Sequence, residues 1–300
     1  MTEEFSLDWL DLREPFDALA RSEALAARLL ARLPARPRLL DLGAGTGSLF
    51  RWLAPRIGRA QAWTLVDADR EMAEAAFDTI ADRAEAIGLK ISFPNRKTLL
   101  VHAPGGAWRV EALAADLAEA PENLPLHNAD AVLSSALCDL VSTPWLEDMA
   151  TALRIPFYAA LCVDGRDRFT PPHPADARVA AGFRRDQIRD KGFGGAALGP
   201  AAPAAIARIF GARGFTVESA ASDWVARGRG GLAHPSLRDR SAQFLAELVM
   251  GHAASAERQD PRGAARIAGW SAARLGQVAE RRLALRIGHR DVLALPGERA

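Results

Sequence analysis

Residues 39–48 read LLDLGAGTGS and join a short apolar run to glycines at alternate positions. Leu39, Leu40 and Leu42 form the kind of run that is typical of a strand buried on both faces. The glycines follow at once, and a loop without side chains can turn tightly and let a ligand reach the backbone at the start of the next helix. The pattern predicts a buried strand, a nucleotide-binding loop and a helix.

The spacing of the glycines, and the acid before them, narrow the choice of ligand. Dinucleotide-binding loops follow the pattern GxGxxG, whereas Gly43, Gly45 and Gly47 give GxGxG. Asp41 lies two positions before the first glycine, and a carboxylate is a poor neighbour for a pyrophosphate because like charges repel. The same carboxylate suits a ligand that carries ammonium and sulfonium cations.

Strand and helix patterns alternate outward from this loop. Such alternation indicates parallel pairing with right-handed crossovers, which place helices on both faces of one sheet. A hairpin of residues 97–102 and 109–113 is expected to lead into the third strand. The other expected strands are residues 39–42, 62–66, 131–134 and 156–163, and the expected helices are residues 48–57, 71–87 and 145–153.

The remaining segments predict a helical N-terminus and two insertions. Residues 1–35 form an expected helical cap, in which Pro15 indicates a break between two helices. The main domain is expected over residues 36–300, with insertions at about 165–200 and 228–282 on the side of the substrate. The first insertion reads as a long loop or lid with a helix near residues 180–190. The last part predicts a helix from residue 204, a sixth strand over residues 216–227, helices at 236–254 and 262–282, and a final strand near the C-terminus.

With these landmarks the sequence resembles the class I S-adenosylmethionine-dependent methyltransferases. Their first motif is an acid followed by GxGxG, and their second is an acid at the end of the second strand, here Asp67 twenty residues past Gly47. The resemblance implies an α/β fold, a Rossmann-like seven-stranded, mostly parallel sheet with an antiparallel last strand. It also implies S-adenosyl-L-methionine as the cofactor. The residues expected to bind it are Arg13, Asp41, Gly43, Ala44, Gly45, Gly47, Asp67, Ala68, Asp116, Leu117 and Ser134.

The resemblance also implies roles for several of these residues and their neighbours. Asp67 would accept hydrogen bonds from the ribose hydroxyls, and Asp116 would lie near the adenine amino group. Ser134, Ser135 and Asp139 would lie beside the methyl group, and Arg13 could hold the carboxylate of the cofactor.

The catalytic candidates lie after the fourth and fifth strands and in the first insertion. Methyl transfer to a hydroxyl needs a group that takes one proton, and an imidazole titrates near neutrality. We expect His173, Asp139 and Asp164 to be the catalytic candidates, with Arg166, Asp167, Gln187, Asp190 and Lys191 nearby. O-methylation and N-methylation both stay open, and no metal ligands are expected.

Composition favours a small-molecule acceptor in a cytoplasmic protein. The formal net charge is +1 and the chain has two cysteines, Cys138 and Cys162, both in apolar runs. The sequence lacks the strong basic field and the (N/D)PP(Y/F) motif that would indicate a nucleic-acid substrate. An RNA methyltransferase is therefore less favoured. The acidic N-terminus is unlike a signal peptide, and no stretch of about 18 strongly apolar residues predicts a membrane anchor.

Two further alternatives remain. A nicotinamide-dependent oxidoreductase would share the glycine loop and Asp67, but Tyr158 is the only tyrosine and no lysine follows it by four residues. A non-catalytic module that binds the same cofactor, or a protein partner, stays open because a fold does not establish an activity.

Overall fold

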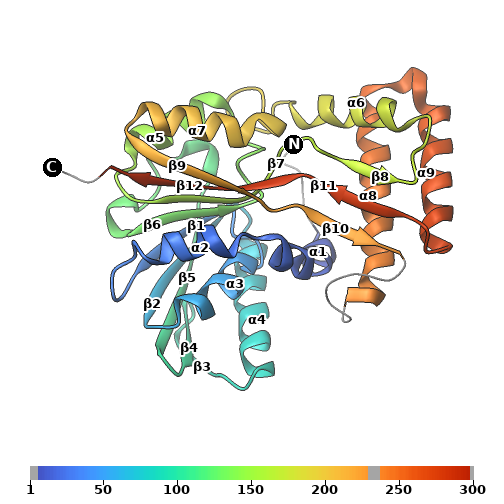
Figure 1. The fold of residues 1–300 in the computed structure, drawn as a ribbon. Helices are drawn as coiled ribbons and strands as arrows, with labels where there is room; N and C mark the ends of the chain where they lie inside the picture. Colours follow the sequence, from blue (N-terminus) through green and yellow to red (C-terminus); the bar gives the residue numbers. More distant parts are fainter. Residues whose placement is uncertain (1–5, 229–236, 298–300) are drawn as a thin grey trace.

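The computed structural model describes residues 6–228 and 237–297, and a nine-stranded sheet runs through the middle of the molecule (Figure 1). From one edge to the other its strands are β3 (Lys90–Asn95), β4 (Thr98–Ala103), β5 (Gly106–Ala114), β2 (Gln61–Asp67), β1 (Arg38–Leu42), β6 (Ala131–Ser135), β7 (Phe157–Val163), β12 (His289–Pro296) and β9 (Phe215–Ala221).

The centre of the sheet is parallel and its edges are antiparallel. Strand β1 pairs in parallel with β2 on one side and β6 on the other, so Leu39 lies opposite Trp63 and Ala131. Strand β12 runs antiparallel between β7 and β9. The predicted Rossmann-like class is therefore confirmed. The predicted count of seven strands is wrong, because the antiparallel strands β3 and β4 extend the sheet beyond β5.

Helices cover both faces of the sheet. Because successive strand residues point to opposite faces, Leu40 packs in the cluster that holds α5 (Thr143–Ala152) and α7 (Ala202–Ala212). Its neighbour Leu39 packs in the opposite cluster, with α2 (Glu23–Leu30), α3 (Ser48–Ile57) and α4 (Arg70–Ala86). The apolar run at the start of the motif thus serves both halves of the core.

The sequence predicted a break between two N-terminal helices at Pro15, but the break lies farther along the chain. Helix α1 (Leu7–Ala20) continues through Pro15 and ends before Ser22, whose hydroxyl caps α2 by accepting a hydrogen bond from the Leu25 amide. A proline leaves the carbonyl four residues earlier without its helical donor. Arg240 supplies one, because its guanidinium donates to the Asp11 carbonyl at 3.0 Å. Residues 1–5 of the predicted cap lie outside the described residues.

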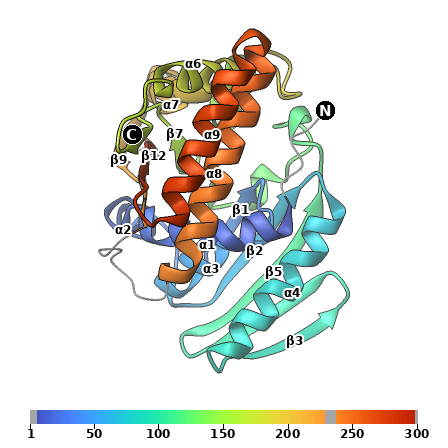
Figure 2. The same cartoon turned by 90° about the vertical axis from the view of Figure 1, so that its right-hand side faces the viewer.

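The two predicted insertions pack against each other beyond one end of the sheet (Figures 1 and 2). Helix α6 packs on α8, and α8 lies beside α9. Beside these helices lies a second, small sheet of β10, β11 and β8. The predicted strand over residues 216–227 and the predicted last strand are each divided between the large sheet and this small one. The elements are α6 (Asp176–Gln187), α8 (Arg238–Gln259), α9 (Ala264–Ala279), β8 (Arg168–Thr170), β10 (Trp224–Arg227) and β11 (Ala284–Ile287).

Short 3-10 turns complete the described chain. They are η1 (Leu117–Glu119), η2 (Leu126–Asn128), η3 (Gly199–Ala201) and η5 (Pro261–Gly263). No helix among the described residues is both long and apolar enough to cross a membrane. The predicted helix start at residue 236 lies outside the described part.

The contact between α6 and α8 depends on Gly182. A Cβ at this position would lie 2.8 Å from the Cα of Ala256 on α8. We predict that Gly182→Ala lowers the free energy of unfolding by about 1–3 kcal/mol, because overpacking outweighs the better helix propensity of alanine. Urea unfolding followed by circular dichroism measures this change.

Gly269→Ala is the matched control. Gly269 is also inside a helix, α9, but no atom lies within 4 Å of the position of its Cβ. This substitution should raise stability by about 0.5–1 kcal/mol. Equal effects of the two substitutions would contradict the close approach of α6 and α8.

Candidate active site

The loop after β1 lies at the carboxyl edge of the parallel strands and has the backbone that the glycines predict. Gly43, Gly45 and Gly47 have φ values of +64°, +52° and +81°, a region that side chains disfavour. Gly47 is also the N-cap of α3. The Gly45 amide donates a hydrogen bond of 2.9 Å to the carboxylate of Asp67, so the ends of β1 and β2 are tied together.

A cavity of about 870 Å³ opens beside this loop, and we call it the central cavity. It lies at the carboxyl ends of β1, β2, β5 and β6, where open α/β sheets bind ligands. Helix α1 and the segment 191–193 complete its walls. Of the residues expected to bind the cofactor, Arg13, Asp41, Gly43, Ala44, Gly45, Asp67, Ala68, Asp116 and Leu117 line it.

Asp41 is the most perturbed acid of this cavity. Its side chain is fully buried, and neither carboxylate oxygen has a hydrogen-bond partner among the described residues. The pKa of Asp41 is raised to about 8: burial has the largest effect and raises it, the guanidinium of Arg21 lowers it, and the nearby Asp67 raises it. A buried carboxyl without a partner is costly, so this side chain is suited to a cation bound in the cavity.

Asp67 and Asp116 are held by backbone amides. The second carboxylate oxygen of Asp67 accepts from the Asp69 amide at 3.1 Å. Asp116 caps the short η1 turn by accepting from the Ala118 amide at 2.9 Å, and its side chain is exposed. Each carboxylate oxygen has two lone pairs, so both acids keep acceptor capacity toward the cavity.

Two of the expected cofactor-binding residues do not line the central cavity. Gly47 lies behind the loop at the start of α3. Ser134 is buried, and its hydroxyl contacts the Cys138 thiol at 3.5 Å. The neighbouring Ser135 lines the cavity instead, because successive strand residues alternate in direction.

Helix α1 forms the boundary between the central cavity and a second one. Arg13 lines both cavities, and its Nε pairs with Asp17 at 3.0 Å. The guanidinium of Arg13 also lies 5.0 Å from the ring centre of Trp224. Asp17 accepts a hydrogen bond from the indole of Trp224, so α1 is tied to β10.

The second cavity measures about 390 Å³, within the range of small-molecule sites. It shares Arg13, Ala136, Leu140 and Lys191 with the central cavity. Sequence reasoning did not place most of its side chains, because they come from α1, α6, α8, β10 and β12. The aromatic and imidazole side chains that line it are Trp9, Phe183, Trp224, His252 and His289.

The structure separates the catalytic candidates. Asp139 lines the second cavity. Asp164 does not, because its carboxylate pairs with Arg166, whose guanidinium also reaches Asp223 at 2.9 Å. His173 lines neither cavity: its Nδ1 accepts from the Ala175 amide at 3.1 Å, at the start of α6. The structure therefore brings neither His173 nor Asp164 to the central or the second cavity.

Of the other polar and charged residues in the first insertion, Gln187 and Lys191 line the second cavity. Asp167 lies 3.5 Å from the Nε2 of His252. Asp190 forms an isolated β-bridge with Ala196 across the GFGG turn, and the Ser142 hydroxyl donates to the Phe193 carbonyl at 2.6 Å. The turn that the sequence suggested as a lid is thus a wall of the central cavity.

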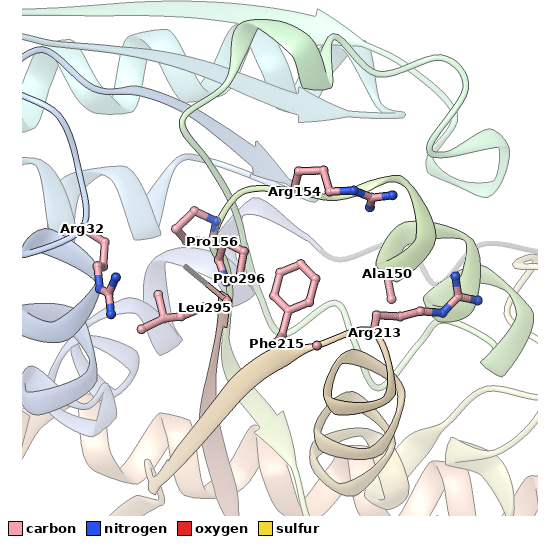
Figure 3. A pocket seen from close by; sticks show the side chains of 10 residues that line it. Arg32, Ala150, Arg154, Pro156, Arg213, Phe215, Leu295 and Pro296 are labelled. Carbon is pink, nitrogen blue, oxygen red and sulfur yellow. The ribbon is translucent and has the colours of Figure 1, made fainter. Parts of the chain in front are cut away.

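A third hollow, of about 820 Å³, lies at the opposite edge of the sheet (Figure 3). Arg32, Arg154 and Arg213 line it, and each lies at the C-terminal end of a helix. Cations are favoured there by the helix dipole, and Arg154 donates to the Thr151 carbonyl at 2.7 Å. The hollow lies at the amino end of β7, beside Pro156, and not at the carboxyl ends of the parallel strands.

Comparison with known proteins gives a short sequence match. No family model matches the chain. The bifunctional biotin biosynthesis protein BioCD of Bordetella avium (strain 197N) is 52% identical over 56 residues. This match covers 18% of the chain and 12% of BioCD, so it spans only a small part of either protein.

Solved structures give matches over much more of the chain, at low identity. A SAM-dependent methyltransferase from Aquifex aeolicus has a TM-score of 0.42 and 14% identity, covering 72% of this chain and 91% of its own. The phospholethanolamine N-methyltransferase 2 of Haemonchus contortus, solved with S-adenosylhomocysteine, has a TM-score of 0.45 and 13% identity, covering 97% and 57%. The [4+2]-cyclase SpnF has a TM-score of 0.42 and 15% identity, covering 96% and 94%.

The chain resembles the class I S-adenosylmethionine-dependent methyltransferases. The resemblance is carried by its own sheet, in which β12 runs antiparallel between β7 and β9, and by Asp41 with the glycine loop.

The raised pKa of Asp41 makes a prediction about stability. A carboxyl whose pKa is higher in the folded than in the unfolded state lowers stability as the pH rises from its unfolded pKa, near 4, to its folded pKa, about 8. Asp41→Asn removes this penalty. The variant should gain about 1 kcal/mol over the wild type for each pH unit in that interval, and no more above it.

Urea unfolding at several pH values between 5 and 9 tests this expectation. Asp82→Asn, at an exposed position on α4, is the matched control and should parallel the wild type. A constant difference between Asp41→Asn and the wild type at every pH would contradict the assignment of a raised pKa to Asp41.

Proposed function

We propose that this chain is an S-adenosylmethionine-dependent methyltransferase that acts on a small-molecule acceptor. One observation carries the proposal: a buried carboxylate without a protein partner, Asp41, lies under a side-chain-free loop in a cavity that also presents Asp67 and Asp116. This set suits a ligand with a cationic amino-acid part and a nucleoside part. S-adenosylmethionine, when bound, supplies a methyl group on a sulfonium that an acceptor can attack.

Each residue of the central cavity then has a task. Asp41 would hold the ammonium group, Asp67 the ribose hydroxyls, and Asp116 the adenine amino group. The loop of Gly43, Ala44 and Gly45 would let the nucleoside approach the backbone. Arg13 would pair with the carboxylate of the cofactor, because it lines the central cavity and its bond to Asp17 is made by Nε.

The second cavity is the proposed place of the acceptor. It is small, adjoins the central cavity through Arg13, Ala136, Leu140 and Lys191, and has several aromatic walls. A cavity of this size with aromatic walls can orient one small molecule, which suits a metabolite better than an RNA strand. The neighbouring Asp139 is proposed to contact the acceptor.

Two other functions are distinguishable from this one. An oxidoreductase would bind NADH in the central cavity, but the loop there has the spacing GxGxG and not the GxGxxG of dinucleotide-binding loops. A non-catalytic module would bind S-adenosylmethionine without transferring its methyl group to any metabolite. Incubating the protein with a metabolite extract and methyl-labelled S-adenosylmethionine separates a catalyst from a binding module.

Isothermal titration calorimetry with S-adenosylhomocysteine tests the cofactor. We predict binding that releases one proton at pH 7, because the ligand's ammonium group favours the ionised form of Asp41, whose pKa is about 8 without ligand. Affinity should rise about tenfold per pH unit from 6 to 8. Buffers with different ionisation enthalpies measure the released proton.

Asp41→Asn should bind at least about tenfold more weakly and release no proton, whereas the exposed control Asp82→Asn should behave as the wild type. NADH should not bind. Tight binding of NADH, or unchanged binding of S-adenosylhomocysteine by Asp41→Asn, would refute the proposed cofactor site.

A further inference from the structure

One histidine in the second cavity has an unusually well-fixed ring. His289 is the first residue of β12, and its backbone amide donates to the Asp223 carboxylate at 3.0 Å. Its carbonyl accepts from the Ser222 amide at 2.9 Å. The residue is 2% exposed, and its ring packs against Trp224 with 4.5 Å between ring centres. Both backbone and ring are therefore held in place.

The hydrogen bond of this ring selects one tautomer. Nδ1 lies 3.1 Å from the carbonyl oxygen of Ile287, and a carbonyl can only accept, so Nδ1 carries a proton. In a neutral imidazole the lone pair then belongs to Nε2. This nitrogen has no hydrogen-bond partner among residues 6–228 and 237–297, and His289 lines the second cavity.

The surroundings of His289 keep its ring neutral. Burial lowers the pKa of His289 from its usual value, and the positive charge of Arg13 lowers it further. The carboxylates of Asp17 and Asp167 act in the opposite direction, and Asp223 is engaged by Arg166 and Arg286. At neutral pH the imidazole is thus free to take a proton.

His252, the other histidine of the cavity, lacks this freedom. Its Nδ1 lies 2.7 Å from the Leu248 carbonyl, and its Nε2 is buried and lies 3.5 Å from the Asp167 carboxylate. Its ring stacks on Phe183 at 4.0 Å. His252 therefore builds the wall, because the lone pair of its Nε2 is buried, whereas His289 offers its lone pair to the cavity.

Aromatic side chains from several elements form part of the walls of the second cavity. Phe183 comes from α6, Trp9 from α1 and Trp224 from β10. The rings of Trp9 and Trp224 meet edge to face, with 6.3 Å between their centres. Two of the charges that line the cavity have counter-ions: Arg13 pairs with Asp17, and Asp186 pairs with Arg258 at 2.8 Å. Aromatic walls favour a planar ring.

We propose that His289 is the general base of the methyl transfer and that the acceptor is a phenol-type hydroxyl on a flat ring. This inference rests on the proposed function. A phenol is about as acidic as a tyrosine side chain, so an imidazole can accept its proton during the transfer. An aliphatic alcohol holds its proton much more tightly and would gain less from this base.

The step balances as a substitution. Nε2 of His289 takes the hydroxyl proton while the acceptor oxygen forms a bond to the methyl carbon. The bond between that carbon and sulfur breaks, and its electron pair stays on sulfur. The products are an aryl methyl ether, S-adenosylhomocysteine and an imidazolium, which then gives its proton to water.

A matched set of acceptors tests the chemical class. The purified chain is incubated with methyl-labelled S-adenosylmethionine and 2-naphthol, decahydro-2-naphthol or 2-naphthylamine, which are similar in size. Label should pass to 2-naphthol at least about tenfold faster than to the other two. If S-adenosylhomocysteine binds but 2-naphthol receives no label, or receives it no faster than the other two, the phenol assignment is wrong. If S-adenosylhomocysteine does not bind, the proposed function itself fails.

Substitutions test the base with the same acceptor. His289→Asn keeps a donor for the Ile287 carbonyl but cannot take the proton, so kcat should fall about a hundredfold or more, with little change in KM or in binding of S-adenosylhomocysteine. The acid limb of the wild-type pH profile, with a midpoint below 6.5, should disappear in this variant. His102→Asn, at an exposed position on strand β4, is the control.

His173→Asn tests the candidate that the sequence favoured and should keep wild-type kcat. Loss of kcat in His173→Asn, or its retention in His289→Asn, would overturn the assignment. If His289→Asn does not fold, NMR of ¹³Cε1-histidine in the wild type decides. One histidine signal should titrate below 6.5 and shift when 2-naphthol is added to the complex with S-adenosylhomocysteine, and the absence of such a signal refutes the proposal.

Discussion

The position of β1 between β2 and β6 is the constraint on which the rest of the structure depends. Because β1 pairs in parallel on both sides, the chain leaves it over one face of the sheet and reaches β6 along the other. A crevice must then open at the carboxyl end of β1. Asp41 and the glycine loop lie at this point, so strand order alone brings them to the central cavity together with Asp67 and Asp116.

The same geometry makes the site a local cost to stability. Asp41 is fully buried, and the nearest cation that affects it, Arg21, is engaged with the hydroxyls of Ser48 and Ser135 at 3.0 Å. The protein therefore holds a carboxyl whose charge the fold does not fully compensate. A bound cation would compensate it, and this couples ligand binding, proton release and stability through one side chain.

The second cavity depends on contacts between distant parts of the chain. Asp17 joins α1 to Trp224 of β10, and Asp291 of β12 accepts from the Ser22 amide, the Tyr158 hydroxyl and the Leu161 amide at 2.7–2.8 Å. These bonds tie α1 to β10, and the start of α2 to β12. They hold Arg13 at the boundary of the two cavities and His289 in the wall of the second one.

The sequence by itself determined the strand after residue 38, the glycine loop, the parallel class of the sheet and the acids at the strand ends. Each of these follows from local periodicity and from the rule that parallel strands end at one edge. The prediction of a helix break at Pro15 was wrong. The Asp11 carbonyl that Pro15 leaves without a donor is satisfied by Arg240, a residue far along the chain that local sequence does not show. Only the tertiary structure places His289, and not His173, in the wall of the second cavity, because a side chain's access to a cavity depends on which distant elements pack around it.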